Sequence, residues 1–444
     1  MIKKIEIEKL ANDGEGLAYD DNKPVYVYYA LPGEVIEAEV FTNQRNALEG
    51  KIIDIKEESQ YRVKPQCPYY GLCGGCTLQH LDYFETLKYK REKLSFMFST
   101  KIRKSTNKTT INNTIKSDFE YRYRNQTDLP VAFDGEKNIA GLYIRGSNQI
   151  FDMNDCVIQK ANLSLTINKI LKIMTDLEIY GYNYRSKKGV VKYISVRTNS
   201  LGEMQITFVL KQATDLEILV SKTASISNKV VSIYQIINDN DKSREALRGP
   251  KKLLFGSRYL KEYIDDKIFL LSPESFFQLN YDVTKKVYQL IKEKGNFSKE
   301  DVILDAYAGV ASIGIYLADS VKQVWSIEIN NSAVKAAEEA VKLNKIENIK
   351  VISGDVVKMT DYLTKQHFDK VIFDPPRSGL GEDVVNFVLK NEPKSVIYLS
   401  CDVKSLVKDL KMLSSKYDIL ETTPIDMFPM TAHVESITFL ALKV

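Results

Sequence analysis

The chain has 444 residues, of which 44% are hydrophobic, and its 62 Lys and Arg against 58 Asp and Glu give a formal net charge of +4. This length is too great for one hydrophobic core, so we expect two to four domains in an ordinary globular protein. No apolar run is long enough to span a membrane, and the start MIKKIEIEKL lacks the features of a signal peptide, so we expect a cytoplasmic protein with no membrane partner.

Residues 1–58 alternate between apolar and polar side chains in the segments IKKIEIEKL, PVYVYYA, EVIEAEVF and GKIIDIK. The turn signals NDGEG, DDNKP and LPGE separate these segments, so the pattern predicts a small antiparallel β-barrel. The stretch resembles a TRAM domain, whose LPGE turn stands here at 31–34. That resemblance implies an OB-like barrel that binds RNA, and a β-barrel without this function is the alternative.

Residues 59–265 form the second predicted domain, of mixed α and β character, and it begins with the cysteine-rich stretch CPYYGLCGGC at 67–76. The chain has five cysteines, and three of them lie in this stretch. Because thiols stay reduced in the cytoplasm, such a cluster favours metal binding or catalysis over disulfides. The glycines between the cysteines let the loop wrap closely around a compact centre.

Basic and aromatic side chains are mixed in three stretches of this second domain. They are a predicted helix at 83–100, YRYRNQ at 121–126 and YRSKKGVVKYISVR at 184–197. This mixture suits phosphate contacts together with base stacking, and we single out Arg122 and Arg124 as RNA-binding candidates. Solvated helix faces and edge strands would produce the same pattern.

From residue 266 to residue 444, buried strands alternate with helical segments, which predicts a doubly wound parallel sheet of the Rossmann type. Ligands bind beyond the carboxyl ends of the strands in such sheets. Four acids and a thiol occupy the predicted strand ends: Asp305, Glu328, Asp355, Asp374 and Cys401. Their convergence at one edge predicts a ligand-binding and catalytic site there.

An acid at the end of the second strand, Glu328, suits the two hydroxyl donors of a ribose. Both NAD and S-adenosylmethionine carry such a ribose. The turn DAYAGVASIG at 305–314 lacks the glycine pattern that cradles a pyrophosphate, so S-adenosylmethionine is favoured and a NAD-dependent oxidoreductase is the alternative. In FDPPRSG at 373–379, two prolines fix the backbone directly after Asp374 and hold its carboxylate at the cofactor.

The segments FFQLN, DAYAG, FDPPRSG, YLSCD and MFPMTAHVE, in this order, make the chain similar to the RNA (uracil-C5)-methyltransferase family. Within that family it resembles the iron–sulfur branch, which modifies 23S rRNA. The resemblance implies methyl transfer from S-adenosylmethionine to carbon 5 of a uridine through a covalent Cys–uracil intermediate, with no protein partner required. The T-loop uridine of tRNA is the alternative target, and a non-catalytic RNA-binding protein is the alternative function.

The resemblance also assigns residues. Cys401 matches the nucleophile, and Glu435 matches the base that removes the carbon-5 proton after the thiolate has added to carbon 6. The target base must be flipped out of its stack to reach the thiol. The predicted cofactor-binding residues are Gln278, Tyr307, Gly309, Glu328 and Asp374, which match family positions, and Asp355, which stands at a predicted strand end.

Cys67, Cys73 and Cys76, spaced C-x5-C-x2-C, together with Cys156 resemble the family's ligands of a [4Fe-4S] cluster. A zinc ion held by the same four thiolates is the alternative. We expect the cluster to be structural, because methyl transfer needs no electrons.

Three residues depart from the family pattern: Ala308, Ala311 and Asp402. We expect the Cβ of Ala311 to narrow the turn against the cofactor. We also expect Asp402 to raise the pKa of the neighbouring Cys401 thiol unless its carboxylate is paired.

Overall fold

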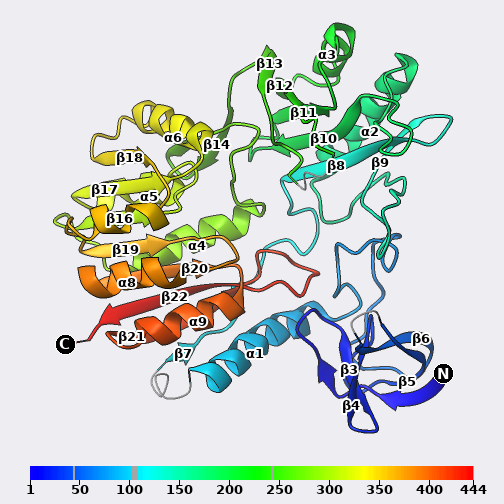
Figure 1. Cartoon of the computed structure of the whole chain (residues 1–444), viewed down its shortest axis with the longest axis horizontal. Helices are drawn as coiled ribbons and strands as arrows, with labels where there is room; N and C mark the ends of the chain where they lie inside the picture. The colour runs from blue at the N-terminus through cyan, green and yellow to red at the C-terminus, as the bar shows by residue number, and fades with distance from the viewer. Residues whose placement is uncertain (44–45, 103–108, 242–244, 444) are drawn as a thin grey trace.

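The computed structural model describes residues 1–43, 46–102, 109–241 and 245–443. Its N-terminal part is a six-stranded sheet of order β1-β5-β6-β4-β3-β2, antiparallel except for the pair β4·β6 (Figure 1). The strands are β1 (Ile2–Glu6), β2 (Lys9–Leu10), β3 (Gly16–Asp20), β4 (Lys23–Val27), β5 (Val35–Thr42) and β6 (Leu48–Glu57). Alternate apolar side chains of these strands form one small core, as the period of two predicts.

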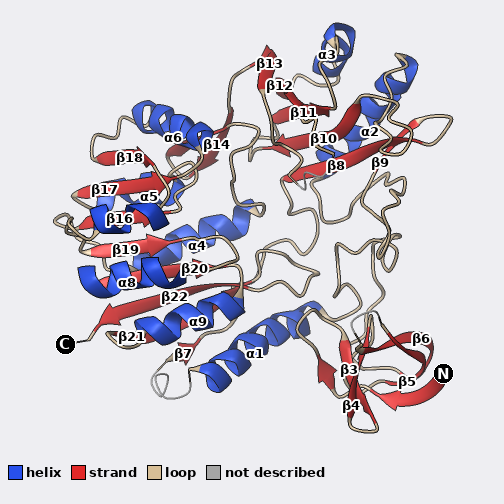
Figure 2. Ribbon diagram, in the orientation of Figure 1, coloured by secondary structure: helices blue, strands red, loops and turns tan. Residues whose placement is uncertain are grey.

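The second sheet has the order β13-β12-β11-β10-β8-β9. Its strands are β8 (Gln126–Phe133), β9 (Asn138–Ala140), β10 (Val191–Thr198), β11 (Met204–Leu210), β12 (Val230–Ile237) and β13 (Lys251–Gly256). Helices α2 (Ala161–Asp176) and α3 (Glu217–Ala224) contact each other and pack on this sheet in a common core (Figure 2).

The C-terminal sheet has the order β18-β17-β16-β19-β20-β22-β21-β7. Its strands are β16 (Val302–Ala306), β17 (Gln323–Glu328), β18 (Ile349–Ser353), β19 (Lys370–Phe373), β20 (Ser395–Ser400), β21 (Tyr417–Ile425), β22 (Glu435–Leu442) and the short β7 (Thr110–Ile111). Strands β16 to β20 are parallel, and β22 is antiparallel to β20. The strand order reverses between β16 and β19, which is where doubly wound sheets bind ligands.

Helices cover both faces of this sheet, as the alternating pattern predicts (Figure 2). The core of one face includes α4 (Tyr281–Lys294), α5 (Ser312–Leu317) and α6 (Asn331–Leu343), and the core of the other includes α1 (Tyr83–Lys101), α7 (Thr360–Leu363), α8 (Gly381–Asn391) and α9 (Val403–Leu413). Among the described residues, no helix is both long enough and apolar enough to cross a membrane.

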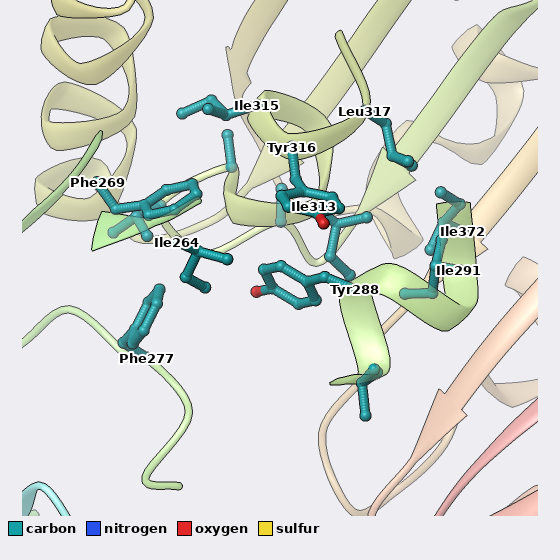
Figure 3. Close-up of a cluster of buried hydrophobic side chains, with 14 of the residues drawn as sticks. Ile264, Phe269, Phe277, Tyr288, Ile291, Ile313, Ile315, Tyr316, Leu317 and Ile372 are labelled. Carbon is teal, nitrogen blue, oxygen red and sulfur yellow. The ribbon is translucent and has the colours of Figure 1, made fainter. Parts of the chain in front are cut away.

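Helix α5 follows the turn after β16, and its buried side chains pack against α4. Figure 3 shows Tyr288 of α4 beside Ile313 and Tyr316 of α5. The buried Tyr288 hydroxyl donates to Ser312 Oγ at 2.6 Å, and the Tyr316 hydroxyl donates to Asp265 at 2.9 Å. Large aromatic rings with satisfied hydroxyls hold the start of α5 in one position.

The domain boundaries at 58/59 and 265/266 stay predictions. Helix α1 and strand β7 come from the predicted central domain but pack on the C-terminal sheet. The boundary at 265/266 falls in the turn of a hairpin formed by β14 (Leu260–Ile264) and β15 (Lys267–Leu271). The two regions are therefore interlocked rather than joined by a simple linker.

Candidate active site and cysteine centre

The predicted site residues follow one another along one edge of the C-terminal sheet. The neighbouring strands β17, β16, β19 and β20 end at Glu328, Ala306, Phe373 and Ser400. Because these strands are parallel, their carboxyl ends share an edge. Glu328, Tyr307, Asp374 and Cys401 thus line up there in the order of the strands.

The turn after β16 is shaped by three left-handed residues, Tyr307, Gly309 and Ala311, with φ of 63°, 56° and 57°. This turn presents the Gly309 N–H to Glu328 Oε2 at 2.9 Å. The Asn330 N–H donates to the other oxygen of Glu328 at 2.7 Å. Two backbone donors therefore orient the carboxylate, and each of its oxygens keeps a lone pair for a ribose hydroxyl.

The expectation for Ala311 is wrong. Its side chain is fully buried in the core that contains α4 and α5, so it does not narrow the turn against a ligand. Ala311 instead destabilises the fold through its backbone, because a left-handed conformation costs a residue with a Cβ about 1 kcal/mol.

Asp374 is joined to the FFQLN segment. The Gln278 Nε2 donates to Asp374 Oδ2 at 3.2 Å, and the Gln278 carbonyl accepts from Asn125 Nδ2 at 3.1 Å. Burial raises the pKa of Asp374 to about 6, and the bond from Gln278 opposes this shift. The segment before α4 thus closes over the end of β19, so these two predicted cofactor residues lie together.

Of the other two predicted acids, Asp305 is buried, whereas Asp355 is half-buried in the turn after β18. Asp305 Oδ2 accepts from the Gly314 N–H at 3.0 Å and from Ser326 Oγ at 3.2 Å, and burial raises the pKa of Asp305 to about 7. It therefore fixes α5 against β17. Asp355 Oδ1 accepts from the Val357 N–H at 3.0 Å. Burial, with a smaller contribution from the Asp355 charge, raises the pKa of Tyr307 to about 12.

Cys401 and Glu435 are brought together by the antiparallel pair β20·β22. Ser400 is opposite Ser436 in this ladder, so Cys401 and Glu435 are the next opposed positions. Directly opposed residues of antiparallel strands have Cβ atoms about 5 Å apart on the same face. The structure therefore joins residues far apart in the sequence into one pair at the ligand edge.

The surroundings of this pair keep both groups protonated at neutral pH. Burial, then the carboxylates of Glu435 and Asp374, raises the pKa of the Cys401 thiol to about 11. Burial, then Asp374, raises the pKa of Glu435 to about 8. The exposed Arg377 opposes both shifts. Sequence reasoning did not single out Arg377, although it lies inside the FDPPRSG segment.

These pKa values predict a pH dependence. Only the thiolate attacks, so the single-turnover rate of Cys401 addition should rise about tenfold per pH unit through neutral pH. Glu435 is ionised only above about pH 8, where its charge raises the thiol pKa, so replacing it by Gln should increase the rate of addition above that pH and leave the rate at neutral pH unchanged. Rapid-quench rates of RNA adduct formation at several pH values measure this. A flat profile, or a shift to higher pH, would contradict it.

Asp402 is paired, so it does not act on Cys401 as an unpaired charge would. It is the N-cap of α9, and its Oδ1 accepts from the Ser405 N–H at 2.8 Å. The carboxylates that raise the thiol pKa are Glu435 and Asp374. The departure at Asp402 therefore serves the helix that follows β20.

The four cysteines of the predicted centre come from two loops that the structure brings together. Cys67, Cys73 and Cys76 precede α1, and Cys156 precedes α2. Cys76 and Cys156 pack against one small buried cluster, and Cys73 and Cys156 pack against the core of the second sheet, so thiols of the two loops lie near one another. Burial raises the pKa of Cys76 to about 12 and also raises that of Cys156.

Four free, partly buried thiols are a donor set suited to a soft metal centre. The Gly75 N–H already donates to Cys73 Sγ at 3.3 Å, the kind of bond that stabilises a thiolate ligand. In the part of the chain that the structure describes, no three Cys, His, Asp or Glu side chains are already arranged to hold a metal ion. Four thiols are the right ligand type for such a centre, but they would have to move closer together to coordinate it.

The basic stretches contribute much of their charge to internal packing. Arg122 donates to both oxygens of Asp155 at 2.8 and 2.6 Å and to the Cys156 carbonyl at 3.1 Å. Arg124 Nε donates to the Gln126 carbonyl at 2.8 Å. Lys90 of α1 is fully buried beside Asp426. The RNA-binding role of Arg122 and Arg124 stays a prediction.

Comparison with known proteins gives matches along the whole chain. Residues 82–443 match the family described as tRNA (Uracil-5-)-methyltransferase, and residues 2–53 match the TRAM domain. An uncharacterized RNA methyltransferase of Staphylococcus aureus (strain MSSA476) is 33% identical over 449 residues, 100% of this chain and 98% of the relative. One of Bacillus anthracis is 34% identical over 99% of this chain and 96% of the relative.

Among solved structures, the chain is similar to Pyrococcus abyssi tRNA (uracil-54, C5)-methyltransferase in complex with S-adenosyl-L-homocysteine. The TM-score is 0.79 at 27% sequence identity, and the match covers 99% of both chains.

Proposed function

The chain belongs to the tRNA (uracil-5-)-methyltransferase family. We propose that it methylates carbon 5 of a uridine in 23S rRNA, with Cys401 and Glu435 as the catalytic residues. The protein is an S-adenosylmethionine-dependent RNA (uracil-C5)-methyltransferase with an N-terminal TRAM domain. The residue roles and the target RNA are the proposed part. The observation that supports the residue roles is the register of β20 and β22, whose last pair, Ser400 and Ser436, is directly followed by Cys401 on one strand and preceded by Glu435 on the other.

Cys401 acts first. The Cys401 thiol and the Glu435 carboxyl, both protonated at neutral pH, first lose their protons to solvent. The sulfur then forms a bond to carbon 6 of the flipped uracil, and the electrons of the C5–C6 double bond make carbon 5 nucleophilic. S-adenosylmethionine, when bound, supplies the methyl group. The Glu435 carboxylate then takes the proton from carbon 5, the electrons of that C–H bond re-form the double bond, and the sulfur leaves as a thiolate.

The residues around this pair hold the cofactor. Glu328, fixed by two backbone N–H groups, binds the ribose hydroxyls. Asp355 follows β18 and Tyr307 follows β16, on the two sides of Glu328 in strand order, and the bonded pair of Gln278 and Asp374 lies on the side of Cys401. Gly309 lets the turn adopt its left-handed conformation and leaves its outer side open.

For the cysteine centre we propose a [4Fe-4S] cluster held by Cys67, Cys73, Cys76 and Cys156. The support is the packing that brings thiols of the two loops together, and the four-thiol set leaves Cys401 for catalysis. A zinc ion on the same four thiols is the alternative. The centre would tie the loop before α1 to the loop before α2, which is a structural role.

The proposed target, 23S rRNA, follows from the resemblance of the four cysteines to those of the iron–sulfur branch. The T-loop uridine of tRNA is the second candidate, favoured by the similarity to the Pyrococcus abyssi enzyme. Mapping 5-methyluridine in both RNAs of a deletion strain tests the choice. Loss of one or two sites in 23S rRNA is expected, loss in tRNA would establish the second candidate, and loss in neither would contradict both.

A paired substitution tests the predicted RNA-binding residues. If Arg122 and Arg124 bind phosphates, changing both to Ala should weaken RNA binding and lower its salt dependence by about one unit of slope for each phosphate that is no longer bound. Filter binding at several salt concentrations measures the slope. A weaker affinity with an unchanged slope would assign both residues to the internal hydrogen bonds that they make.

A further inference from the structure

The loop that joins β21 to β22, residues 426–434, is almost entirely buried although it contains no helix or strand. Loops usually run over the surface, because buried backbone groups need hydrogen-bond partners. This loop ends directly at Glu435, the first residue of β22. Glu435 is paired with Ile425 of β21 at the base of the loop, so contacts that hold the loop act together with this pair in placing Glu435.

Side chains from several distant parts of the chain bind the carbonyls of this loop. They are Asn280 on Met427 (3.3 Å), Lys90 on Phe428 (3.0 Å), Tyr123 on Pro429 (3.1 Å) and Lys93 on Ala432 (3.0 Å). Both lysines belong to α1. The loop thus takes its shape from its surroundings and not from its own sequence.

The segment of residues 67–81, which we call the cysteine loop, also forms hydrogen bonds to the 426–434 loop. The N–H groups of Thr77 and Leu78 donate to the Met430 carbonyl at 3.1 and 3.0 Å. The Ala432 N–H donates to Thr77 Oγ1 at 3.1 Å. The Thr77 carbonyl accepts from the Tyr70 hydroxyl at 2.9 Å. All three polar groups of Thr77 are therefore engaged, and two of them bind the loop.

The same place is packed as well as hydrogen-bonded. Thr77 directly follows Cys76 in the sequence. The Met430 side chain belongs to a buried cluster against which Cys76 and Cys156 pack. The cysteine centre and the loop before Glu435 are therefore in direct contact.

We propose that Thr77 is a positioning residue for the second half of the reaction. It ties the 426–434 loop to the cysteine loop and so holds the Glu435 carboxylate where it takes the carbon-5 proton. This inference rests on the proposed role of Glu435 as the base. It also connects the cysteine centre to catalysis, because Thr77 directly follows the proposed ligand Cys76.

The two catalytic groups depend on Thr77 unequally. Replacing Thr77 by Val keeps the shape but removes the acceptor of the Ala432 N–H, which lies in a buried segment. The loop then relaxes and shifts the Glu435 side chain at the end of its pair with Ile425, whereas Cys401, which follows β20, has no contact with Thr77 through this loop. Small misplacements of a catalytic group cost rate steeply. Thiol addition and methyl transfer should therefore proceed while elimination slows.

The experiment compares Thr77→Val with Thr77→Ser, which keeps the hydroxyl. The matched control is Thr114→Val, because the Thr114 hydroxyl donates to the Leu87 carbonyl at 2.7 Å and does not touch the loop. With RNA and S-adenosylmethionine, Thr77→Val should lower kcat about tenfold and accumulate a covalent protein–RNA band on denaturing gels. Its single-turnover methylation rate should stay within about twofold of the unmodified protein. Thr77→Ser and Thr114→Val should behave like the unmodified protein.

Normal turnover of Thr77→Val without extra adduct would overturn the proposal. An equal fall in turnover and single-turnover methylation would also overturn it, since that is the mark of a general structural role. If Thr77→Val does not fold, Lys93→Met, which removes the bond to the Ala432 carbonyl, must give the same pattern or the proposal falls. Failure of the proposed function itself would appear separately, as absence of adduct in Glu435→Gln.

Discussion

Glu435→Gln is expected to lower turnover by about 10²- to 10⁴-fold and to trap the protein on its RNA substrate. The substitution keeps the Cys401 thiol, so addition to carbon 6 still occurs. Without a base the carbon-5 proton stays, and the sulfur cannot leave. Denaturing gel electrophoresis with labelled RNA should therefore show a protein–RNA band, and labelled S-adenosylmethionine should show that the band carries a methyl group.

Cys401→Ala is the matched variant, because it removes the other member of the same opposed pair. It should bind RNA, transfer no methyl group and give no covalent band. The two substitutions thus abolish turnover at different steps. If Glu435→Gln turns over normally, or gives no band with both substrates present, the base has been assigned wrongly. Asp374, whose raised pKa and closeness to Cys401 also suit a base, would then be the next candidate.

Removal of one cysteine of the predicted centre should have the second large effect. Protein purified without oxygen should be brown from thiolate-to-iron charge transfer. Cys73→Ser should be colourless, contain little iron and unfold at lower denaturant concentration, because binding of a structural metal contributes directly to folding. Iron analysis and urea unfolding measure both changes.

Cys401→Ser is the control for this effect, because Cys401 directly follows β20 of the C-terminal sheet and is not one of the four proposed ligands. It should keep its iron and its stability. One zinc ion and no iron in the unmodified protein would replace the cluster by the alternative centre. Full stability and unchanged metal content of Cys73→Ser would remove Cys73 from the ligand set.

The strands of this protein could be predicted from the sequence because their patterns are local. Alternation predicted β1, β4, β5 and β6, and buried runs predicted the parallel strands and their functional ends. The pairing of β20 with β22 could not be predicted in the same way, since it joins segments that are separated by α9 and β21. That pairing is what places Glu435 opposite Cys401.

The residues that were interpreted wrongly or incompletely share one cause. Nothing local shows that Ala311 points into the core, that Asp402 caps α9 or that Arg122 is bonded to Asp155. In each case a distant or following segment supplies the partner. The role of Thr77 could not be predicted for the same reason, because it depends on Met430 and Ala432, which are far away in the sequence.

Release of the carbon-5 hydrogen is the most direct test of methyl transfer to carbon 5 of uracil. RNA carrying [5-³H]uridine is incubated with the purified protein and S-adenosylmethionine, and tritium in water is compared with methyl groups in RNA. We predict one tritium released for each methyl group incorporated, with neither seen for Cys401→Ala. Methyl incorporation without tritium release would place the methyl group on another atom and contradict this account.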